Sequence, residues 1–258
     1  MAPQLIAGLA LTALVGVSLG LLGAGGSIIM LPVLVYVMGV EPHAAVPLSL
    51  AVIGTTSLLS VAVPSPEREI HWRVAFGFGS AALVGTYLGS RLTSLVPGSV
   101  LLLSFGLLLV LVGFRMWRGS TADDNPARVR RRPLLMLAAG SSVGVLTGFL
   151  GVGGGFLIVP AMVRVGGLAM CEATRTSLVV IAMSSIAGAA AHLTHENSVS
   201  LGLAVPLTLA ALAGMVAGVQ GARHVSGRHL RQGFAGFVTS VGIALILVNT
   251  PTAIRLLG

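Results

Sequence analysis

Lysine is absent from this chain of 258 residues, so all fifteen of its cationic side chains are arginine. Charged residues make up only 9% of the chain, whereas they are about a quarter of an average soluble domain. So few charges cannot cover the surface of a soluble globule of this size. The hydrophobic content of 55% also excludes intrinsic disorder, which requires low hydrophobicity and high net charge.

Cysteine and clustered metal ligands are also scarce. Cys171 is the only cysteine, which excludes an internal disulfide. His192 and His195 lie three residues apart, but no third ligand follows at metal-site spacing, so we expect no metal site and no cofactor. The seven acidic residues fall at or near the ends of apolar runs, and no Ser–His or paired-carboxylate arrangement indicates catalysis. We therefore expect that the protein is not an enzyme.

The formal net charge is +8 and the mean hydropathy is +0.99. Basic proteins often bind nucleic acid, but these arginines are scattered between long apolar runs, which is typical of charges that orient a protein in a membrane. The chain is therefore predicted to be a polytopic membrane protein whose partner is the lipid bilayer and not nucleic acid.

Runs without charged residues mark the membrane segments. A helix needs roughly 20 apolar residues to cross a bilayer, and two runs are too long for one helix and contain glycine clusters, at 23–26 and 151–155. The absence of apolar–polar alternation favours helices over a barrel. We predict an all-α fold with about ten helical segments, eight full spans and two short or broken Gly-rich ones, at 5–22, 28–39, 44–63, 74–90, 99–117, 134–150, 156–168, 173–193, 199–220 and 232–250.

The chain resembles itself when it is shifted by 128 residues. Eight of 17 positions are identical between 16–32 and 144–160, and the same offset aligns 49–53 with 177–181. Compositional similarity alone would not hold one offset over this length. We predict a first transmembrane repeat over 1–117, an Arg-rich linker over 118–133 and a second transmembrane repeat over 134–258.

The arginines favour an inverted relation between the two repeats. If all ten segments cross and the linker is cytoplasmic, thirteen arginines fall on the cytoplasmic side and two outside, whereas a parallel arrangement divides them nine to six. Inverted repeats with interrupted helices at matching positions are typical of secondary transporters. We expect a multi-pass protein of the cell (plasma or inner) membrane.

The glycine motifs and the residues around them resemble those of a known family. The pattern Gly-Phe-Leu-Gly-Val-Gly-Gly-Gly-Phe-Leu-Ile-Val-Pro at 148–160, followed by Thr176-Ser177-Leu178, is similar to the TauE/SafE family of sulfite-exporter-type permeases. The first repeat carries a weaker version at 20–26, and Ile70-His71-Trp72 resembles another short motif of the family. The resemblance implies transport of small, mostly sulfur-containing anions. Position 175 is an arginine where the family usually has a small residue.

Candidate substrate-binding residues follow from the repeated motifs. Glycines let the backbone approach an anion closely, and helix starts offer N–H donors; tight helix crossing is the alternative explanation. Arg175 matches an oxyanion through paired hydrogen bonds, or it snorkels from a helix end. The hydroxyls are either donors to the substrate or bonded to their own helical turn. The predicted site comprises Gly25, Gly26, Ser27, Ser49, Gly153, Gly154, Gly155, Arg175, Thr176 and Ser177.

Arg91 and Arg223 are the last residues of two similar Gly-x-Arg triplets, each near the end of the fourth segment of its half. They are candidate gating residues, although arginines that simply mark a membrane end are the favoured alternative. The predicted function is alternating-access transport of sulfite or a related sulfur oxyanion or organosulfonate, and a homodimer is a possible assembly. The alternatives are a membrane-embedded enzyme or assembly factor that handles a sulfur compound, and a passive anion channel.

Overall fold

The computed structural model describes residues 2–22, 26–63, 69–93, 95–118, 133–150, 154–168, 170–193, 201–221, 235–236 and 238–250. Every regular element within these ranges is helical, which confirms the predicted all-α class and its ten segments. The helices are α1 (Ala2–Leu22), α2 (Ser27–Pro32) with the π-helical turn η1 (Val33–Val37), α3 (Pro42–Ala62), α4 (Trp72–Thr93), α5 (Gly98–Arg118), α6 (Pro133–Leu150), α7 (Gly155–Arg164), α8 (Met170–Leu193), α9 (Leu201–Gly221) and a C-terminal helix, Val238–Thr250.

Four helices are long and apolar enough to cross a membrane by their length and composition: α1, α3, α8 and α9. Shorter apolar helices cover Ser27–Val37, Gly98–Phe114, Leu134–Leu150 and Val238–Thr250. Large apolar side chains are exposed on the outer helices, among them Leu107, Leu134 and Leu209. An apolar exterior is stable against lipid tails but not against water, so the chain is a multi-pass membrane protein.

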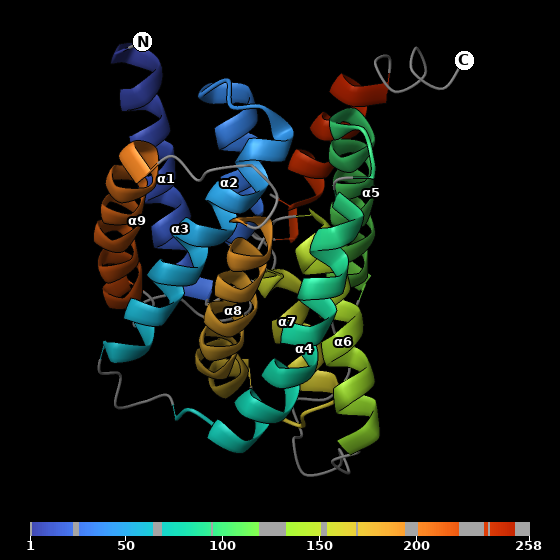
Figure 1. The fold of residues 1–258 in the computed structure, drawn as a ribbon. Coiled ribbons are helices and arrows are strands. Elements are labelled where there is room, and N and C mark those ends of the chain that lie inside the picture. The colour runs from blue at the N-terminus through green and yellow to red at the C-terminus, as the bar shows by residue number, and fades with distance from the viewer. Residues whose placement is uncertain are drawn as a thin grey trace.

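Helices α3 and α8 form the centre of the bundle, where they pack against each other (Figure 1). Within their apolar windows 67% of α3 and 78% of α8 is buried, against 33% of α1 and 28% of α9. A helix that is apolar on all sides is stable when other helices surround it. Residues of α3 and α8 are therefore the best placed to lie within the protein at mid-membrane depth.

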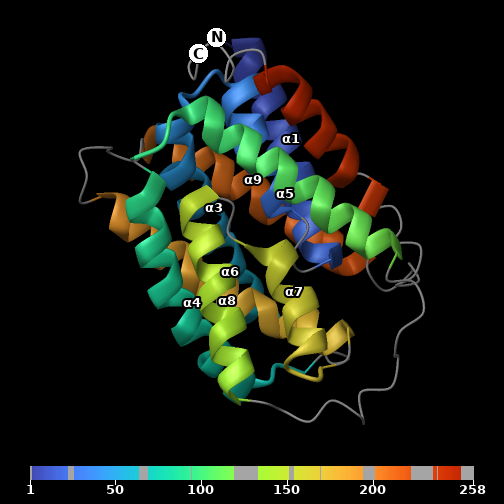
Figure 2. The ribbon, with the colours of Figure 1, turned by 90° about the vertical axis from the view of Figure 1, so that its right-hand side faces the viewer.

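Helix α4 packs closely on α6, and the two run in the same direction (Figure 2). A Cβ atom on Gly85 would overlap the carbonyl oxygen of Ser141, and one on Gly89 would overlap that of Val145, one turn further along both helices. Thr93 also donates to the Gly148 carbonyl, at 3.2 Å. Small residues at such positions allow the two backbones to touch.

Helix α1 packs on α9 in the same way, again in parallel (Figure 1). A Cβ on Gly16 would overlap the carbonyl oxygen of Ala211, and one on Gly20 would overlap that of Met215. Both helix pairs are reciprocal, because glycines of the partner helices also face the first helix's carbonyl groups: Gly144 and Gly148 in α6, and Gly214 and Gly218 in α9. The glycine sets therefore specify which helices pair.

The central pair α3–α8 is antiparallel. A Cβ on Gly54 would meet Ser185 of α8, at 3.1 Å from its Cβ atom, and one on Gly188 would meet Leu50, at 3.0 Å from Cδ1. Earlier in α8, Arg175 reaches the end of α3 near Val63. Residue numbers in α8 thus rise as the contacting residue numbers in α3 fall.

Each glycine cluster lies where one helix ends and the next begins. Helix α1 ends at Leu22 and α2 begins at Ser27, while α6 ends at Leu150 and α7 begins at Gly155. Helix α2 ends at Pro32, which lacks the N–H that an α-helical hydrogen bond requires. The π-helical turn η1 follows, and after it the Met38 N–H donates to the Val33 carbonyl at 3.1 Å. Most of the predicted linker, 119–132, lies outside the described residues.

Candidate functional site

Arg175 is buried near the start of α8, with only 7% of its surface exposed. Its Nη1 donates to the Ser60 carbonyl at 3.2 Å and its Nη2 to the Val63 carbonyl at 2.8 Å. These carbonyls belong to the last turn and C-cap of α3, where a helix carries partial negative charge. The Ser60 carbonyl also accepts from the Val63 N–H, at 3.3 Å. Arg175 therefore ties α8 to the end of α3 and does not extend towards an exposed surface.

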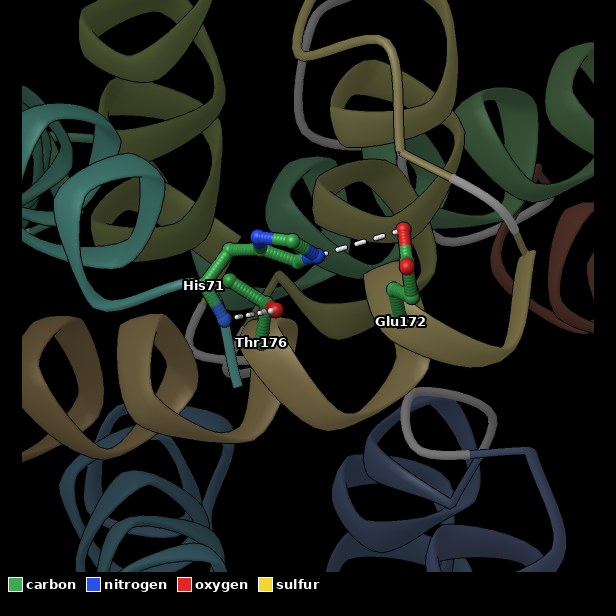
Figure 3. Close-up of polar contacts among 3 residues, drawn as sticks. All are labelled: His71, Glu172 and Thr176. Carbon is green, nitrogen blue, oxygen red and sulfur yellow. Dashed lines mark hydrogen bonds and ion pairs between the residues drawn. The ribbon is translucent and has the colours of Figure 1, made fainter. Parts of the chain in front are cut away.

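The residue that precedes α4, His71, contacts the start of α8 (Figure 3). The backbone N–H of His71 donates to the hydroxyl of Thr176 at 3.1 Å, and His71 Nε2 lies 3.3 Å from Glu172 Oε2. The His71 carbonyl accepts from the first N–H groups of α4, so this residue is also the helix N-cap. When the imidazole is protonated, the contact with Glu172 is an ion pair.

These contacts join three elements that are distant in sequence. Glu172 and Thr176 lie four residues apart on one face of α8, so that one stretch of chain can contact both. With the Arg175 contacts, they form a polar cluster at which α3 ends and α4 and α8 begin. Of the predicted site residues, the structure brings Arg175 and Thr176 into this cluster.

Ser49 and Ser177 are fully buried at matching positions in α3 and α8. The Ser49 hydroxyl donates to the Val46 carbonyl at 2.8 Å, and the Ser177 hydroxyl donates to the Thr174 carbonyl at 2.7 Å. Both hydroxyls thus bond to their own helical turn, which was one of the two expectations for them.

Gly154 lies in the left-handed region, with φ of 61°, and forms the N-cap of α7. A side chain here would be strained, and a Cβ would also overlap the hydroxyl of Thr147. Gly155 follows as the first, buried residue of α7. Glycine is thus required at position 154 by both conformation and packing.

The matching segment in the first half differs in its backbone. Gly26 is right-handed, with φ of −65°, and its importance is spatial, because a Cβ would overlap the carbonyl oxygen of Val15. Ser27, the next residue, is fully buried. The short helices α2 and α7 contact each other. The predicted site residues Gly25 and Gly153 lie outside the described residues.

Arg91 is exposed in the last turn of α4, at the end of the bundle opposite Arg175. Its Nη2 donates to the hydroxyl of Tyr87 at 2.6 Å, and its guanidinium lies 5.2 Å from the centre of the same ring. Both contacts are within one helix. The other gating candidate, Arg223, lies outside the described residues.

Two residues that sequence reasoning missed are Ser57 and Ser185. They are fully buried in α3 and α8, and neither hydroxyl oxygen has a hydrogen-bond partner. The signal was present, since the pairs Thr56-Ser57 and Ser184-Ser185 are also related by the offset of 128. Within the described ranges, no three His, Cys, Asp or Glu side chains converge as metal ligands would.

Comparison with known proteins adds a family match over most of the chain. The family model described as "Sulfite exporter TauE/SafE" matches residues 8–245. A "Probable membrane transporter protein" of Xylella fastidiosa is 39% identical over 173 residues, which are 65% of this chain and 66% of that protein. This match thus spans slightly less than two thirds of the relative's length.

More distant relatives match over a longer stretch. A "Probable membrane transporter protein" of Methanocaldococcus jannaschii is 24% identical, with 91% of this chain and 92% of the relative covered. Another of the same description, YdhB of Bacillus subtilis, is 25% identical over 80% of this chain and 86% of the relative. No solved structure matches the chain.

Proposed function

The chain belongs to the sulfite exporter TauE/SafE family, and from this membership we propose that it is a secondary transporter of a small anion, sulfite or a related sulfur oxyanion or organosulfonate. The relatives' descriptions as membrane transporters and the exposed apolar side chains support this role. The structural observation that carries the proposal is the antiparallel packing of α3 on α8 at the centre of the bundle.

This packing supports an inverted relation between the halves 1–117 and 134–258. The offset of 128 relates α3 to α8 and α1 to α6, and parallel repeats would orient each related pair in the same direction. Instead α3 opposes α8. Two similar halves in opposite orientations can rock between two nearly equivalent states, each open to one side of the membrane.

The reciprocal helix pairs fit the same proposal. The first helix of each half, α1 or α6, packs on the fourth helix of the other half, α9 or α4. The two halves are thus interlocked by equivalent glycine contacts, as a twofold exchange of the halves requires. Rocking would then move α1 with α9 and α4 with α6 as two rigid pairs around the central helices.

The proposed substrate path lies along α3 and α8 between the short helices α2 and α7. Arg175 supplies positive charge at one end of this path, because bonds to carbonyl groups leave the guanidinium charge in place. The Thr176 hydroxyl oxygen accepts from the His71 N–H through one lone pair. The O–H group of Thr176 can therefore donate to an anion. The glycine segments at 25–27 and 153–155 would supply backbone N–H groups.

The proposed orientation puts the 118–133 linker in the cytoplasm. The contacts of Arg175 bring the end of α3 and the start of α8 to one end of the bundle. In the sequence, Arg68, Arg73 and Arg164 are near the end of α3, the start of α4 and the start of α8. An accumulation of arginine at one end is typical of the cytoplasmic side of a cell membrane.

Flux into proteoliposomes tests the proposed function. Purified protein should take up radiolabelled sulfite at a rate that saturates with concentration, and unlabelled sulfite inside the vesicles should accelerate exchange, because one site alternates between two sides. Thiosulfate and a sulfonate should compete with sulfite, and protein-free liposomes are the control. No uptake above this control would contradict transport, while uptake that rises linearly without exchange would indicate a channel.

A further inference from the structure

Two hydroxyl groups on the central helices are buried without a hydrogen-bond partner. Ser57 in α3 and Ser185 in α8 are each 0% exposed, and the Oγ atom of each lacks a partner. Buried polar groups in native proteins are nearly always paired, because an unpaired one loses its bonds to water on folding and gains none. Such a group therefore requires an explanation.

The neighbouring hydroxyls show that the helices themselves can satisfy such groups. Thr56 donates to the Val52 carbonyl at 2.7 Å, and Ser184 donates to the Ile181 carbonyl at 3.3 Å. Serine and threonine in helices commonly form this bond to the preceding turn. Ser57 and Ser185 each adjoin a hydroxyl that forms it, but they do not form it themselves.

Both residues lie where α3 crosses α8. A Cβ on Gly54 would be 3.1 Å from the Cβ of Ser185, so Ser185 of α8 packs directly against α3. Ser57 follows Gly54 by three residues, which places it on the same face of α3, one turn further along. The two serines are related by the offset of 128 residues and come from antiparallel helices.

We propose that Ser57 and Ser185 donate hydrogen bonds to the transported anion at the crossing of α3 and α8, an inference that rests on the proposed transport function. One donor from each half gives the anion equivalent contacts in the two alternating states. A hydroxyl that donates to the transported anion needs no partner within the protein itself, and neither Ser57 nor Ser185 has one.

The surroundings indicate the charge of the anion. No Asp, Glu, Lys or Arg occurs in α3, or in α8 after Arg175. Ser185 lies ten residues beyond Arg175, which is about 15 Å along a helix. Neutral hydrogen-bond donors that lie far from a cation can offset the desolvation cost of one negative charge. They offset the cost of two negative charges far less well. The ligand class is therefore a monoanion, such as hydrogen sulfite or an organosulfonate, and not a dianion such as sulfate.

The test uses the full-length protein with serine variants and matched neighbours. Ser57→Ala, Ser185→Ala and the double variant remove the unpaired hydroxyls, whereas Thr56→Val and Ser184→Ala remove adjacent hydroxyls that bond to their own helix. Two measurements are made: the KM of sulfite uptake in proteoliposomes, and the rise in apparent melting temperature on titration with sulfite or methanesulfonate.

The double variant should raise the KM, and the ligand concentration needed for stabilisation, by about tenfold or more, as expected for lost hydrogen bonds to a charged ligand. The neighbouring variants should change both values by less than about threefold. Ser57→Thr, which keeps a hydroxyl, should restore most of the affinity lost in Ser57→Ala. Without ligand, the double variant should melt at the wild-type temperature or above it, because alanine leaves no unpaired group.

Equal KM values in the double variant and the wild type would overturn the serine site, as would equal losses in the neighbouring variants. A double variant that melts earlier but binds normally would show that the hydroxyls serve the fold alone, which also overturns it. Competition by sulfate as strong as that by methanesulfonate would overturn the monoanion assignment. A wild-type protein that transports no anion would refute the transport function itself, a result that differs from all of these.

Discussion

At the residue scale, Arg175 shows how a buried charge is stabilised in an apolar bundle. Among the described residues, it is the only charged side chain that is buried. A guanidinium in this environment requires hydrogen-bond acceptors, and the end of a helix provides carbonyl groups with partial negative charge. Arg175 therefore has a structural role at the end of α3 whether or not it also attracts the anion.

We predict that Arg175→Ala lowers the free energy of unfolding by about 2–3 kcal/mol, because two charge-assisted hydrogen bonds are lost. The stability of Arg175→Lys should lie between that of the wild type and that of Arg175→Ala, because lysine keeps the charge but not the paired donors. The measurement is the apparent melting temperature in detergent. Arg91→Ala is the matched control, because its arginine is exposed, and it should stay within about 0.5 kcal/mol of the wild type. An Arg175→Ala protein as stable as this control would contradict the structural role.

At the element scale, the glycines explain how helices of nearly uniform apolar composition find their partners. Lipid and helix surfaces are equally apolar, so association depends on close packing and not on hydrophobicity. The glycine sets of α1 with α9 and of α4 with α6 allow backbone contact at these positions. These glycines recur four residues apart in the sequence, a spacing typical of helix packing, but the spacing does not indicate that each pair joins helices from opposite halves.

Gly85→Ala should destabilise the protein by about 1–3 kcal/mol, because the added methyl group overlaps the Ser141 carbonyl and forces α4 away from α6. Gly77→Ala in the same helix is the control, since its Cβ would meet only the end of Met136 at 3.6 Å. This control should be neutral or slightly stabilising, because alanine favours a helix more than glycine does. Melting temperatures in detergent measure both, and a result in which Gly85→Ala melts no earlier than Gly77→Ala would refute the close approach.

At the scale of the whole molecule, the two connections that follow the fourth helix of each half distinguish inverted from parallel repeats. Leu95 lies between α4 and α5, and Ser226 lies in the corresponding stretch after α9. Inverted repeats place these two residues on opposite sides of the membrane, whereas parallel repeats place them on the same side.

We predict that Leu95→Cys reacts with a membrane-impermeant maleimide in intact cells, and that Ser226→Cys and Ala122→Cys react only after permeabilisation. The background is Cys171→Ser, which removes the only native thiol and should leave sulfite flux unchanged because transport requires no nucleophile. Labelling is measured by the mass shift of the purified protein. Equal labelling of Leu95→Cys and Ser226→Cys in intact cells would support parallel repeats.

The sequence by itself determined the membrane class, the ten helical segments and the positions of the two breaks. These follow from local quantities: the length of runs without charge, and the inability of glycine clusters to continue a helix. The offset of 128 residues also identified Ser49 and Ser177 as equivalent positions. Each of these conclusions needs only the order of residues along the chain.

The tertiary structure alone decided which groups meet. The partners of Arg175 are backbone carbonyls more than one hundred residues away, and a backbone carbonyl is present at every position, so no residue type marks it. For the same reason, the contact of the His71 backbone with Thr176 and the unpaired state of Ser57 and Ser185 could not be predicted. Whether a hydroxyl bonds to its own helix depends on its rotamer and its neighbours, and both are set by packing.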